Sequence, residues 1–468
     1  MSESIQAKRS LFETLPPISR SRVYHNFAPS KSRKLDTIIV LDDDPTGTQT
    51  VHGVPVLTDW TPKVLVKEFE NKTPLFYILT NSRSLTEQES VKLTLEIGLQ
   101  IKIAAQKTNT SYWVISRSDS TLRGHYPAEI EALQESLDLQ DPIQFVIPAF
   151  FEGGRYTIND VHYVEQGDQM VPAAQTIYAK DHVFGYQASN LVDWILEKAA
   201  DKVTKAQITS IDLSTLRSSS IEDLTARINT LTPNTICIVN AAAYEDLHVF
   251  SAAILRAEIR PIFRTAASFV ASIAGLEPKP LLAKKDLIQV QQNGGLLIVG
   301  SYVDTTTRQL QYLLKSHPNL SQIELDIPEI LQLEKTGTFT AAIAQQIDQT
   351  IRSGHSTVLY TSRNLVSADT DLKKQNIGKK VSKVVTDIIS QIQVQPSFLL
   401  TKGGITSSDI ATKGLGIKRA VVLGQVIKGV PVWKLGAETK FPNSIQIIFP
   451  GNVGQDTSLA DIVNKLSV

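Results

Sequence analysis

Short apolar runs alternate with longer segments of helical periodicity from about Leu35 onward. Four runs have the length and the β-branched or aromatic content of buried strands: Thr37–Leu41, Leu75–Leu79, Tyr112–Ile115 and Gln144–Ile147. Between them, residues Glu87–Lys107 and Pro127–Leu139 repeat apolar positions at helical spacing. Strands that alternate with helices at this rhythm predict βαβ units and a mainly parallel sheet.

A second series of the same kind begins after a stretch with Pro and Gly residues, which we interpret as a linker over residues 276–293. Its predicted helix lies near Thr306–Lys315, and its predicted strands are Leu296–Val299, Thr357–Tyr360, Ser397–Leu400, Ala420–Leu423 and Ile445–Phe449. The pattern therefore predicts two α/β domains with mainly parallel sheets, over residues 36–275 and 294–468. We expect the cleft for substrate and nucleotide between them.

Composition narrows the class of protein. The chain of 468 residues has 47 Lys+Arg and 47 Asp+Glu, so its formal net charge is zero. This balance lacks the field that general nucleic-acid binders and polybasic membrane-surface proteins use, although a local basic groove stays open. No stretch approaches the ~18 apolar residues of a membrane span, and the N-terminus has no secretory pattern. We expect a soluble, cytoplasmic protein without nucleic-acid or membrane partners.

Cysteine and histidine chemistry is sparse. Cys237 is the only cysteine, which excludes an internal disulfide and a cysteine-based zinc cluster. It lies in the apolar run Thr235–Val239, so we expect a buried strand position rather than a nucleophile. The eight histidines include no HxxxH pair, and only His125 follows a candidate site directly. We interpret His125 as a structural histidine and predict no metal ligands.

The start of the chain differs from the rest. Two acidic residues, Glu3 and Glu13, accompany seven basic ones: Lys8, Arg9, Arg20, Arg22, Lys31, Arg33 and Lys34. We interpret residues 1–35 as an N-terminal extension, with a short helix and an arm that packs on the body or on a second subunit of a homodimer. An organelle-targeting peptide is the alternative, although such peptides are poor in acidic residues.

The loop after the first predicted strand, Leu41–Thr48, contains three consecutive aspartates. Ligands of open α/β sheets bind beyond the carboxyl ends of the strands, which is where this loop lies. Three adjacent carboxylates cannot all be ionised without a cation, a hydroxyl or a backbone donor nearby. One of them could orient a sugar hydroxyl or act as a general base. The alternative is a helix N-cap followed by a Pro/Gly turn.

The loop Ser116–Gly124 places Arg117 and Arg123 around small hydroxyl residues, between a strand and a predicted helix. Arginine offers bidentate donors and a helix start offers free N–H groups, which together suit a carboxylate or a phosphate. A capped turn with surface arginines is the alternative. Thr80–Ser84 is a similar loop with a weaker signal, and both interpretations stay open for it.

Two glycine-rich loops, Leu400–Asp409 and Phe449–Gly454, follow strands of the second series. Glycine lets the backbone approach a ligand closely, and Thr406 or Ser407 could cap a helix whose first N–H groups bind phosphate. Neither loop contains GxxxxGK[ST] or GxGxxG. Together the loops indicate a nucleotide domain that faces an acidic-substrate domain.

These motifs resemble those of the four-carbon acid sugar kinase family. The segments that carry the resemblance are Asp43–Gly47, Ser118–Gly124, Pro148–Arg155, Lys402–Thr406 and Pro450–Gly454, in the family's order over nearly the whole chain from about Leu35. Members of this family pair an N-terminal sugar-acid-binding domain with a C-terminal nucleotide-binding domain. They transfer the γ-phosphate of ATP to four-carbon acids such as threonate, erythronate or 3-oxo-tetronate.

The resemblance implies site residues by position. It implies catalytic roles for Asp43 and Asp119, and Asp181 matches a further family motif, Ala179–Tyr186. The implied substrate contacts are Asp43, Arg83, Arg117, Asp119, Ser120, Thr121 and Arg123. The implied ATP contacts are Ser301, Gly403, Gly404, Ile405, Thr406, Gly451, Asn452, Val453 and Gly454.

Several positions depart from the family pattern. Arg117-Ser118 stands where members often have Lys-x, Ile405 follows the glycine pair where Glu is commoner, and Asn240 stands where an acidic residue is often found. These departures and the N-terminal extension mark a divergent branch, and they leave the particular acid open.

The resulting hypothesis is ATP-dependent phosphorylation of a hydroxyl on a four-carbon acid. Arg83 and Arg123 would hold the substrate carboxylate, Asp43 or Asp119 would orient the attacking hydroxyl, and Mg²⁺ would neutralise the phosphates of ATP. One alternative is a non-catalytic sensor that binds the acid and the nucleotide. The other is a nicotinamide-dependent oxidoreductase, against which the missing GxGxxG counts.

Overall fold

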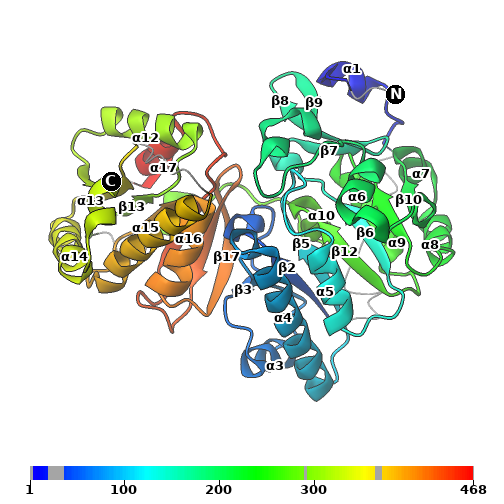
Figure 1. Ribbon diagram of the computed structural model, residues 1–468, viewed down its shortest axis with the longest axis horizontal. Helices are drawn as coiled ribbons and strands as arrows, with labels where there is room; N and C mark the ends of the chain where they lie inside the picture. Colours follow the sequence, from blue (N-terminus) through cyan, green and yellow to red (C-terminus); the bar gives the residue numbers. More distant parts are fainter. Residues whose placement is uncertain (1–3, 19–35, 289–291, 364–370, 467–468) are drawn as a thin grey trace. The chain divides into compact units, whose positions relative to one another are not determined.

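The computed structural model describes residues 4–18, 36–288, 292–363 and 371–466. The chain forms two compact units, Met1–Val51 with Asp59–Pro278 and His52–Thr58 with Lys279–Val468. Each unit is an α/β domain, as the sequence pattern predicts (Figure 1).

The main sheet of the first unit has the strand order β10-β11-β6-β12-β5-β2-β4, and every neighbouring pair is parallel. Its strands are β2 (Thr37–Asp42), β4 (Leu75–Leu79), β5 (Tyr112–Arg117), β6 (Ile143–Ile147), β10 (Ile208–Ile211), β11 (Ile236–Val239) and β12 (Pro261–Thr265). All residues of β2, β4, β6, β11 and β12 are buried, which is typical of a parallel sheet covered on both faces. Cys237 is fully buried in β11, which confirms its predicted strand position.

Helices cover this sheet and give their apolar residues to its core. They are α3 (Pro62–Glu70), α4 (Glu87–Thr108), α5 (Ala128–Ser136), α6 (Leu191–Ala199), α7 (Leu213–Ser218), α8 (Ile221–Asn229), α9 (Tyr244–Ile254) and α10 (Ala267–Ile273). Helix α4 packs against α3 and α5, and α9 packs against α8 and α10. The predicted helices over 87–107 and 127–139 are confirmed as α4 and α5.

A small antiparallel sheet joins the N-terminal segment to the first unit. It has the order β1-β9-β8-β7, with β1 (Gln6–Ala7), β7 (Arg155–Ile158), β8 (Val161–Gln166) and β9 (Gln169–Pro172). The short helix α1 (Lys8–Glu13) follows β1, and the Lys8 ammonium lies 2.7 Å from the Glu165 carboxylate on β8. Residues 4–18 thus form a short helix that packs on the first unit, as expected for the extension. The rest of the predicted extension, residues 19–35 with Arg20, Arg22, Lys31, Arg33 and Lys34, lies outside the described residues.

The sheet of the second unit has the order β3-β17-β18-β19-β16-β13-β15-β14. Its strands are β3 (Pro55–Leu57), β13 (Leu296–Val299), β14 (Ser321–Leu325), β15 (Thr357–Thr361), β16 (Leu399–Lys402), β17 (Arg419–Ile427), β18 (Val430–Leu435) and β19 (Ile445–Phe449). The pairs from β19 to β14 are parallel, whereas β3, β17, β18 and β19 pair antiparallel. The predicted strand at 420–423 therefore exists, but it belongs to an antiparallel hairpin.

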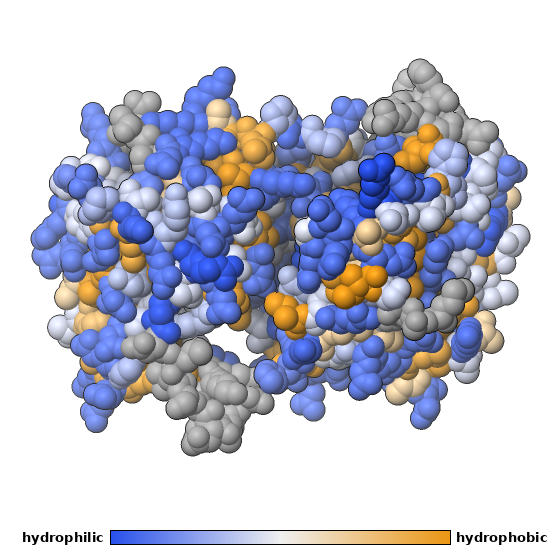
Figure 2. All heavy atoms as spheres, turned by 90° about the horizontal axis from the view of Figure 1, so that it is seen from above, coloured by the Kyte–Doolittle hydropathy of each residue, from blue (hydrophilic) through white to orange (hydrophobic). Residues whose placement is uncertain are grey.

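Helices of the second unit surround a core of leucine, valine and isoleucine side chains from β13, β16, β18 and β19. They are α11 (Lys284–Leu287), α12 (Asp304–Ser316), α13 (Ile327–Gln332), α14 (Gly337–Arg352), α15 (Asp371–Gln391), α16 (Gly404–Asp409) and α17 (Ser458–Leu466). The predicted helix over 306–315 is confirmed as α12. On the face drawn in Figure 2, apolar side chains form small patches among polar ones.

Two segments differ from the predicted domain ranges. Residues 52–58 belong to the second unit, because β3 pairs with β17. The predicted linker over 276–293 contains α11, and Leu287 is fully buried in the core of the second unit. Apolar side chains of the predicted linker thus pack against the core of the second unit instead of lying in solvent. Residues 289–291 lie outside the described residues.

Candidate functional site

The carboxyl ends of β2, β4 and β5 meet at one edge of the first sheet, because these strands are parallel neighbours. The acidic loop follows β2, the Ser82–Ser84 turn follows β4, and Arg117 ends β5. A Cβ on Gly47 would collide with the Asp42 carboxylate, so glycine is required for this approach of the loop. The candidate loops named from the sequence are therefore brought together.

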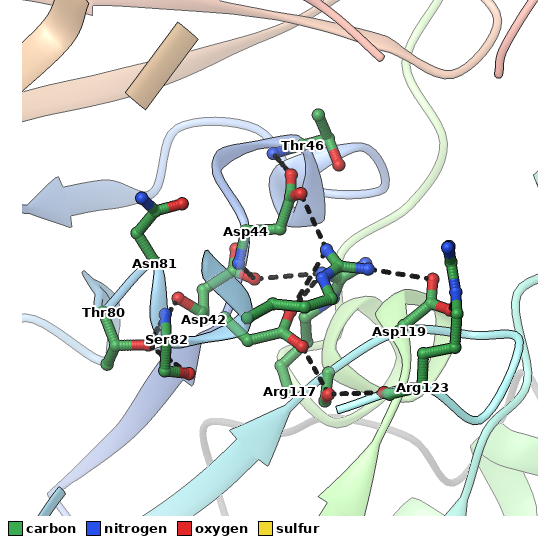
Figure 3. A network of polar contacts seen from close by, with 12 residues as sticks. Asp42, Asp44, Thr46, Thr80, Asn81, Ser82, Arg117, Asp119 and Arg123 are labelled. Atoms are coloured by element: carbon green, nitrogen blue, oxygen red, sulfur yellow. Dashed lines mark hydrogen bonds and ion pairs between the residues drawn. The ribbon is translucent and has the colours of Figure 1, made fainter. Parts of the chain in front are cut away.

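Arg83 bridges carboxylates from separate loops, among them Asp44 and Asp119, which Figure 3 labels. Its Nη2 lies 2.8 Å from Asp44 Oδ2 and 3.5 Å from Asp43 Oδ1, and its Nη1 lies 3.1 Å from Asp119 Oδ1. Burial raises the pKa of Asp44, but the Arg83 charge and hydrogen bonds from Thr46 outweigh it and hold that pKa below its ordinary value. The loop Thr80–Ser84, whose sequence signal was weaker, therefore contains Arg83, the residue that connects Asp43, Asp44 and Asp119.

Arg117 holds the cluster from inside the domain. Its Nη1 lies 3.0 Å from Asp42 Oδ1 and 3.5 Å from Asp43 Oδ1 (Figure 3), and 5% of its side chain is exposed. Burial raises the pKa of Asp42 to about 7, against the opposing charge of Arg117. The Arg117 guanidinium is buried and paired with Asp42 and Asp43, and its contact with the substrate stays a prediction.

Asp43, like Asp42, has one carboxylate oxygen without a hydrogen-bond partner among the described residues. Its Oδ2 accepts a hydrogen bond from Ser118 Oγ at 2.5 Å. Among the described residues, Oδ1 is a buried atom without a hydrogen-bond partner, and the guanidiniums of Arg83 and Arg117 stand 3.5 Å from it. Asp43 also lines a cavity of about 10 Å³, room for one water molecule, together with Ser82 and Glu129.

Both carboxylate oxygens of Asp119 have ion-pair or hydrogen-bond partners. Its Oδ1 pairs with Arg83, and its Oδ2 accepts from Arg123 Nε at 2.8 Å and from Thr121 Oγ1. Burial opposes ionisation, but the charges of Arg123 and Arg83 hold the pKa of Asp119 well below its usual range. Asp119 therefore anchors two arginines.

Arg123 is the most exposed guanidinium of the cluster, at 21% of its side chain. Its Nη1 lies 3.5 Å from Asp181 Oδ2, so the further motif at Asp181 joins the same site. The guanidinium also lies 5.3 Å from the ring centre of Tyr178. Ser120 and Thr121 are 6% and 2% exposed, and their contact with the substrate stays a prediction.

Sequence reasoning missed Glu129 and Arg264. Glu129 is 7% exposed, and its Oε1 accepts hydrogen bonds from Ser82 Oγ at 2.5 Å and from Ser90 Oγ at 2.7 Å. Burial, followed by the negative charge of Asp43, raises the pKa of Glu129. Arg264 is the penultimate residue of the buried strand β12, and its Nη2 donates to the Arg123 carbonyl at 3.0 Å. The sequence signal that could have predicted Arg264 is the presence of an arginine within the apolar run Pro261–Thr265.

His125 supports the site from behind. It is 5% exposed, and its Nε2 lies 3.1 Å from the carbonyl oxygens of both Ser82 and Leu85. The interpretation as a structural histidine is therefore confirmed. Because Arg83 lies within this turn, His125 and Glu129 together fix the segment that presents its guanidinium.

A second cluster of candidate residues lies in the second unit, at the carboxyl ends of the adjacent parallel strands β13, β16 and β19. Ser301 lies between two glycines: a Cβ on Gly403 would lie 3.1 Å from Ser301 Cβ, and one on Gly451 would lie 2.9 Å from Ser301 Oγ. Thr406 abuts Gly300. The loops predicted to bind ATP thus form one cradle in which added side chains would not fit.

Other features of this cradle differ from expectation. Gly403 occupies the N-cap position, with φ of +118°, and α16 begins at Gly404. The predicted caps are inside the helix, where Ser407 Oγ donates to the Gly403 carbonyl at 2.7 Å. Ile405 is 57% exposed, and Asn452 and Gly454 are also exposed. The cradle therefore presents backbone at its glycines together with the exposed side chains of Ile405 and Asn452.

The described residues contain no group of three or more His, Cys, Asp or Glu side chains arranged to hold a metal ion. Within the same part of the chain, no helix has the length and apolar character needed to cross a membrane.

Comparisons with known proteins agree with this division of the chain. Residues 38–273 match the family model of a sugar-binding N-terminal domain, and residues 296–459 match that of a nucleotide-binding C-terminal domain. No curated protein matches the chain.

Solved structures share the fold. The Haemophilus influenzae protein HI1011 is 15% identical, with a TM-score of 0.61 over 92% of this chain and 100% of that chain. A protein from Salmonella typhimurium LT2, named as a proposed tRNA synthase, is 16% identical, with a TM-score of 0.65 over 91% and 98% of the two chains. At these identities the likeness concerns the fold alone.

The fold and the family models define a two-domain protein with a sugar-binding N-terminal domain and a nucleotide-binding C-terminal domain. The chain belongs to the four-carbon acid sugar kinase family.

Proposed function

We propose that this protein is a kinase that transfers the γ-phosphate of ATP to a hydroxyl of a four-carbon sugar acid. The observation that carries the proposal is the geometry around Asp43. The buried Asp43 carboxylate has one oxygen without a hydrogen-bond partner among the described residues and lies 3.5 Å from Arg83 in the sugar-binding domain; Arg83 shares Asp119 with Arg123, and both arginines are partly exposed. A hydroxyl acceptor beside two guanidiniums suits a ligand that carries both a hydroxyl and a carboxylate.

Arg83 and Arg123 are the groups that would hold the substrate carboxylate. Both are anchored by Asp119, with N–O distances of 3.1 Å and 2.8 Å, which fixes their positions relative to each other. Guanidiniums presented in this way bind a carboxylate through paired N–H donors. Asp119 is thus a positioning residue in the proposal.

Asp43 is favoured over Asp119 as the acid that orients the attacking hydroxyl. Both oxygens of Asp119 are taken by arginines and a threonine, whereas Asp43 Oδ1 has no hydrogen-bond partner among the described residues. In the proposed reaction the hydroxyl proton passes to Asp43 as the hydroxyl oxygen bonds to the γ-phosphorus. The bond between that phosphorus and the bridging oxygen breaks, and ADP leaves.

The loops around Ser301, Gly403 and Gly451 would bind the ATP phosphates in this proposal. Backbone N–H groups at glycine positions can approach phosphate oxygens that a Cβ would keep away. Mg²⁺, which usually reaches such sites with the phosphates, would supply charge neutralisation.

The proposal is tested by measuring ADP release from Mg·ATP in the presence of D- and L-threonate, D- and L-erythronate, their 3-oxo derivatives, and five- and six-carbon acids. We expect one four-carbon acid to stimulate release. With that acid, Asp43→Asn should lower turnover about 10²–10⁴-fold with little change in Mg·ATP affinity, the range for loss of an acid–base group.

Asp36→Asn is the matched control, because Asp36 is an exposed carboxylate just before β2. It should keep wild-type turnover. Binding of acid and nucleotide without ADP release would contradict the kinase proposal and favour a sensor. Wild-type turnover in Asp43→Asn would remove Asp43 from the reaction.

A further inference from the structure

Lys402 is a fully buried lysine beneath the glycine cradle of the second unit. It is the last residue of β16, directly before Gly403, and none of its surface is exposed. Its Nζ donates hydrogen bonds to the carbonyl of Pro450 at 2.6 Å and to that of Gly451 at 3.3 Å. The same atom lies 3.6 Å from the ring centre of Phe449. The amine therefore ties the loop after β16 to the loop after β19.

This amine has no counter-ion among the described residues, since no carboxylate lies within ion-pair distance of it. Titratable or charged groups on the surrounding elements are Asp304, Arg308, Asp409, Tyr302 and Arg363. Asp409 pairs with Lys413 at 2.6 Å, Arg308 pairs with Asp456 at 2.9 Å, and Asp304 is exposed.

Arg363 is another basic side chain beside the cradle, so it gives Lys402 no counter-ion. Its Nη1 donates to the Ser301 carbonyl at 2.5 Å and its Nη2 to the Val299 carbonyl at 3.2 Å. The backbone of the cradle is thus held by the side chains of Arg363 and Lys402, which donate hydrogen bonds to its carbonyl oxygens. Burial alone lowers the pKa of Lys402 to about 6, so the amine is largely neutral at pH 7 in the absence of an added negative charge.

The loops that Lys402 holds are the ones that line the cradle. The Gly451 carbonyl accepts from both Lys402 and Thr306 Oγ1, the latter at 3.1 Å. Ser301 lies within contact range of Gly403 and Gly451. An anion over these glycines would therefore face the amine across one layer of backbone, where the interior screens charge weakly.

We propose that Lys402 is a positioning residue that couples nucleotide binding to proton uptake: as anionic phosphates bind over the cradle, the buried amine takes a proton from solvent, and its ammonium holds the Pro450 and Gly451 carbonyls in place. This inference rests on the proposed function, in that the cradle must bind a nucleotide. It adds a residue and a proton that the phosphate-binding loops alone do not require.

The test is calorimetric titration of the protein with Mg·ADP at about pH 8, in buffers of different ionisation enthalpy. We expect uptake of about one proton per nucleotide, because a group that changes from neutral to charged on binding contributes one proton by linkage. Lys402→Met should abolish this uptake. Lys413→Met, which removes a lysine with 68% of its side chain exposed, should keep it. Adenosine, which lacks phosphate, should bind without uptake.

The wild-type protein gives a second measurement that does not depend on the fold of a variant. Its dissociation constant for Mg·ADP should rise about tenfold per pH unit between roughly pH 7.5 and 9, if one proton is bound with the nucleotide. Mg·ADP binding with a flat pH dependence, or with equal proton uptake in Lys402→Met, would overturn the inference and leave the proposed function intact. Absence of Mg·ADP binding would overturn both.

Discussion

At the scale of residues, the acidic loop of the first domain is stable because each aspartate meets a guanidinium. Asp42 pairs with Arg117 on the inner side, and Asp44 pairs with Arg83 on the outer side. Asp43 lies between the two arginines and is 3.5 Å from each. Removing one partner of a buried ion pair typically costs about 3–5 kcal/mol, since the other charge is left buried alone. The two guanidiniums therefore stabilise the charge of Asp43, whose Oδ1 has no hydrogen-bond partner among the described residues.

Asp42 makes the stability of the protein depend on pH. Its folded pKa of about 7 lies above the ordinary value of 3.8, so the folded protein holds a proton that the unfolded chain releases between these values. This stabilisation is fully present below about pH 4 and is lost as the pH rises through about 7. Asp42→Asn removes the titration. Its urea-unfolding midpoint, relative to that of the wild type, should therefore be higher at about pH 8 than at about pH 5.

Asp201→Asn, which removes an exposed carboxylate, is the control and should shift the midpoint equally at both pH values. A midpoint difference between wild type and Asp42→Asn that is independent of pH would contradict the proton assigned to Asp42.

Residue types in loops predicted part of the candidate site, because Arg83, Asp119 and Arg123 occur in hydroxyl-rich loops at strand ends. Glu129 was not predicted, since a glutamate in the first turn of a helix normally indicates an exposed dipole partner. Its contacts with Ser82 and Ser90 depend on how α4 and α5 pack, which the local sequence does not contain. The same holds for the buried place of Arg117.

At the scale of elements, parallel strand order explains how distant loops meet. Strands β13, β16 and β19 are separated by long stretches of chain, but they are neighbours in the sheet, so their carboxyl ends share one edge. Glycine at these ends is required by close approach of backbone: Gly403 combines φ of +118° with a neighbouring Ser301 Cβ.

Gly403→Ala should weaken Mg·ADP binding about tenfold or more, because strained backbone of this kind costs about 1–3 kcal/mol. Gly337→Ala is the matched control: it lies at the first position of α14 with open space around it, and it should bind Mg·ADP like the wild type. Titration calorimetry measures both variants. Equal affinity in Gly403→Ala and wild type would show that the loop does not approach the nucleotide.

Strands and helices with strong periodicity were predicted correctly, since burial on both faces gives continuous apolar runs. The antiparallel strands were harder to predict from the sequence. Strands β7, β8 and β9 alternate with turns and lie partly at the surface, and β3 is only Pro55–Leu57. The pairing of β3 with β17, which lies far along the chain, leaves no local pattern in either segment.

At the scale of the whole molecule, one chain combines a sugar-binding domain, whose sheet edge carries arginines and aspartates, with a nucleotide-binding domain, whose sheet edge carries glycines. The two-domain organisation followed from the repeat of the βαβ pattern, and the predicted cleft between the domains stays a prediction. The acid that fits cannot be derived from charge alone, because arginine binds any carboxylate of suitable reach.

The most direct test of the account is transfer of the γ-phosphate itself. ATP labelled in its γ-phosphoryl group is incubated with the protein and the acid that stimulates ADP release. The products are then separated and identified by mass spectrometry. The account predicts a labelled phosphate ester of the acid, formed in equal amount to ADP and greatly reduced in Asp43→Asn. Label found only in inorganic phosphate, or no turnover while acid and nucleotide both bind, would contradict it.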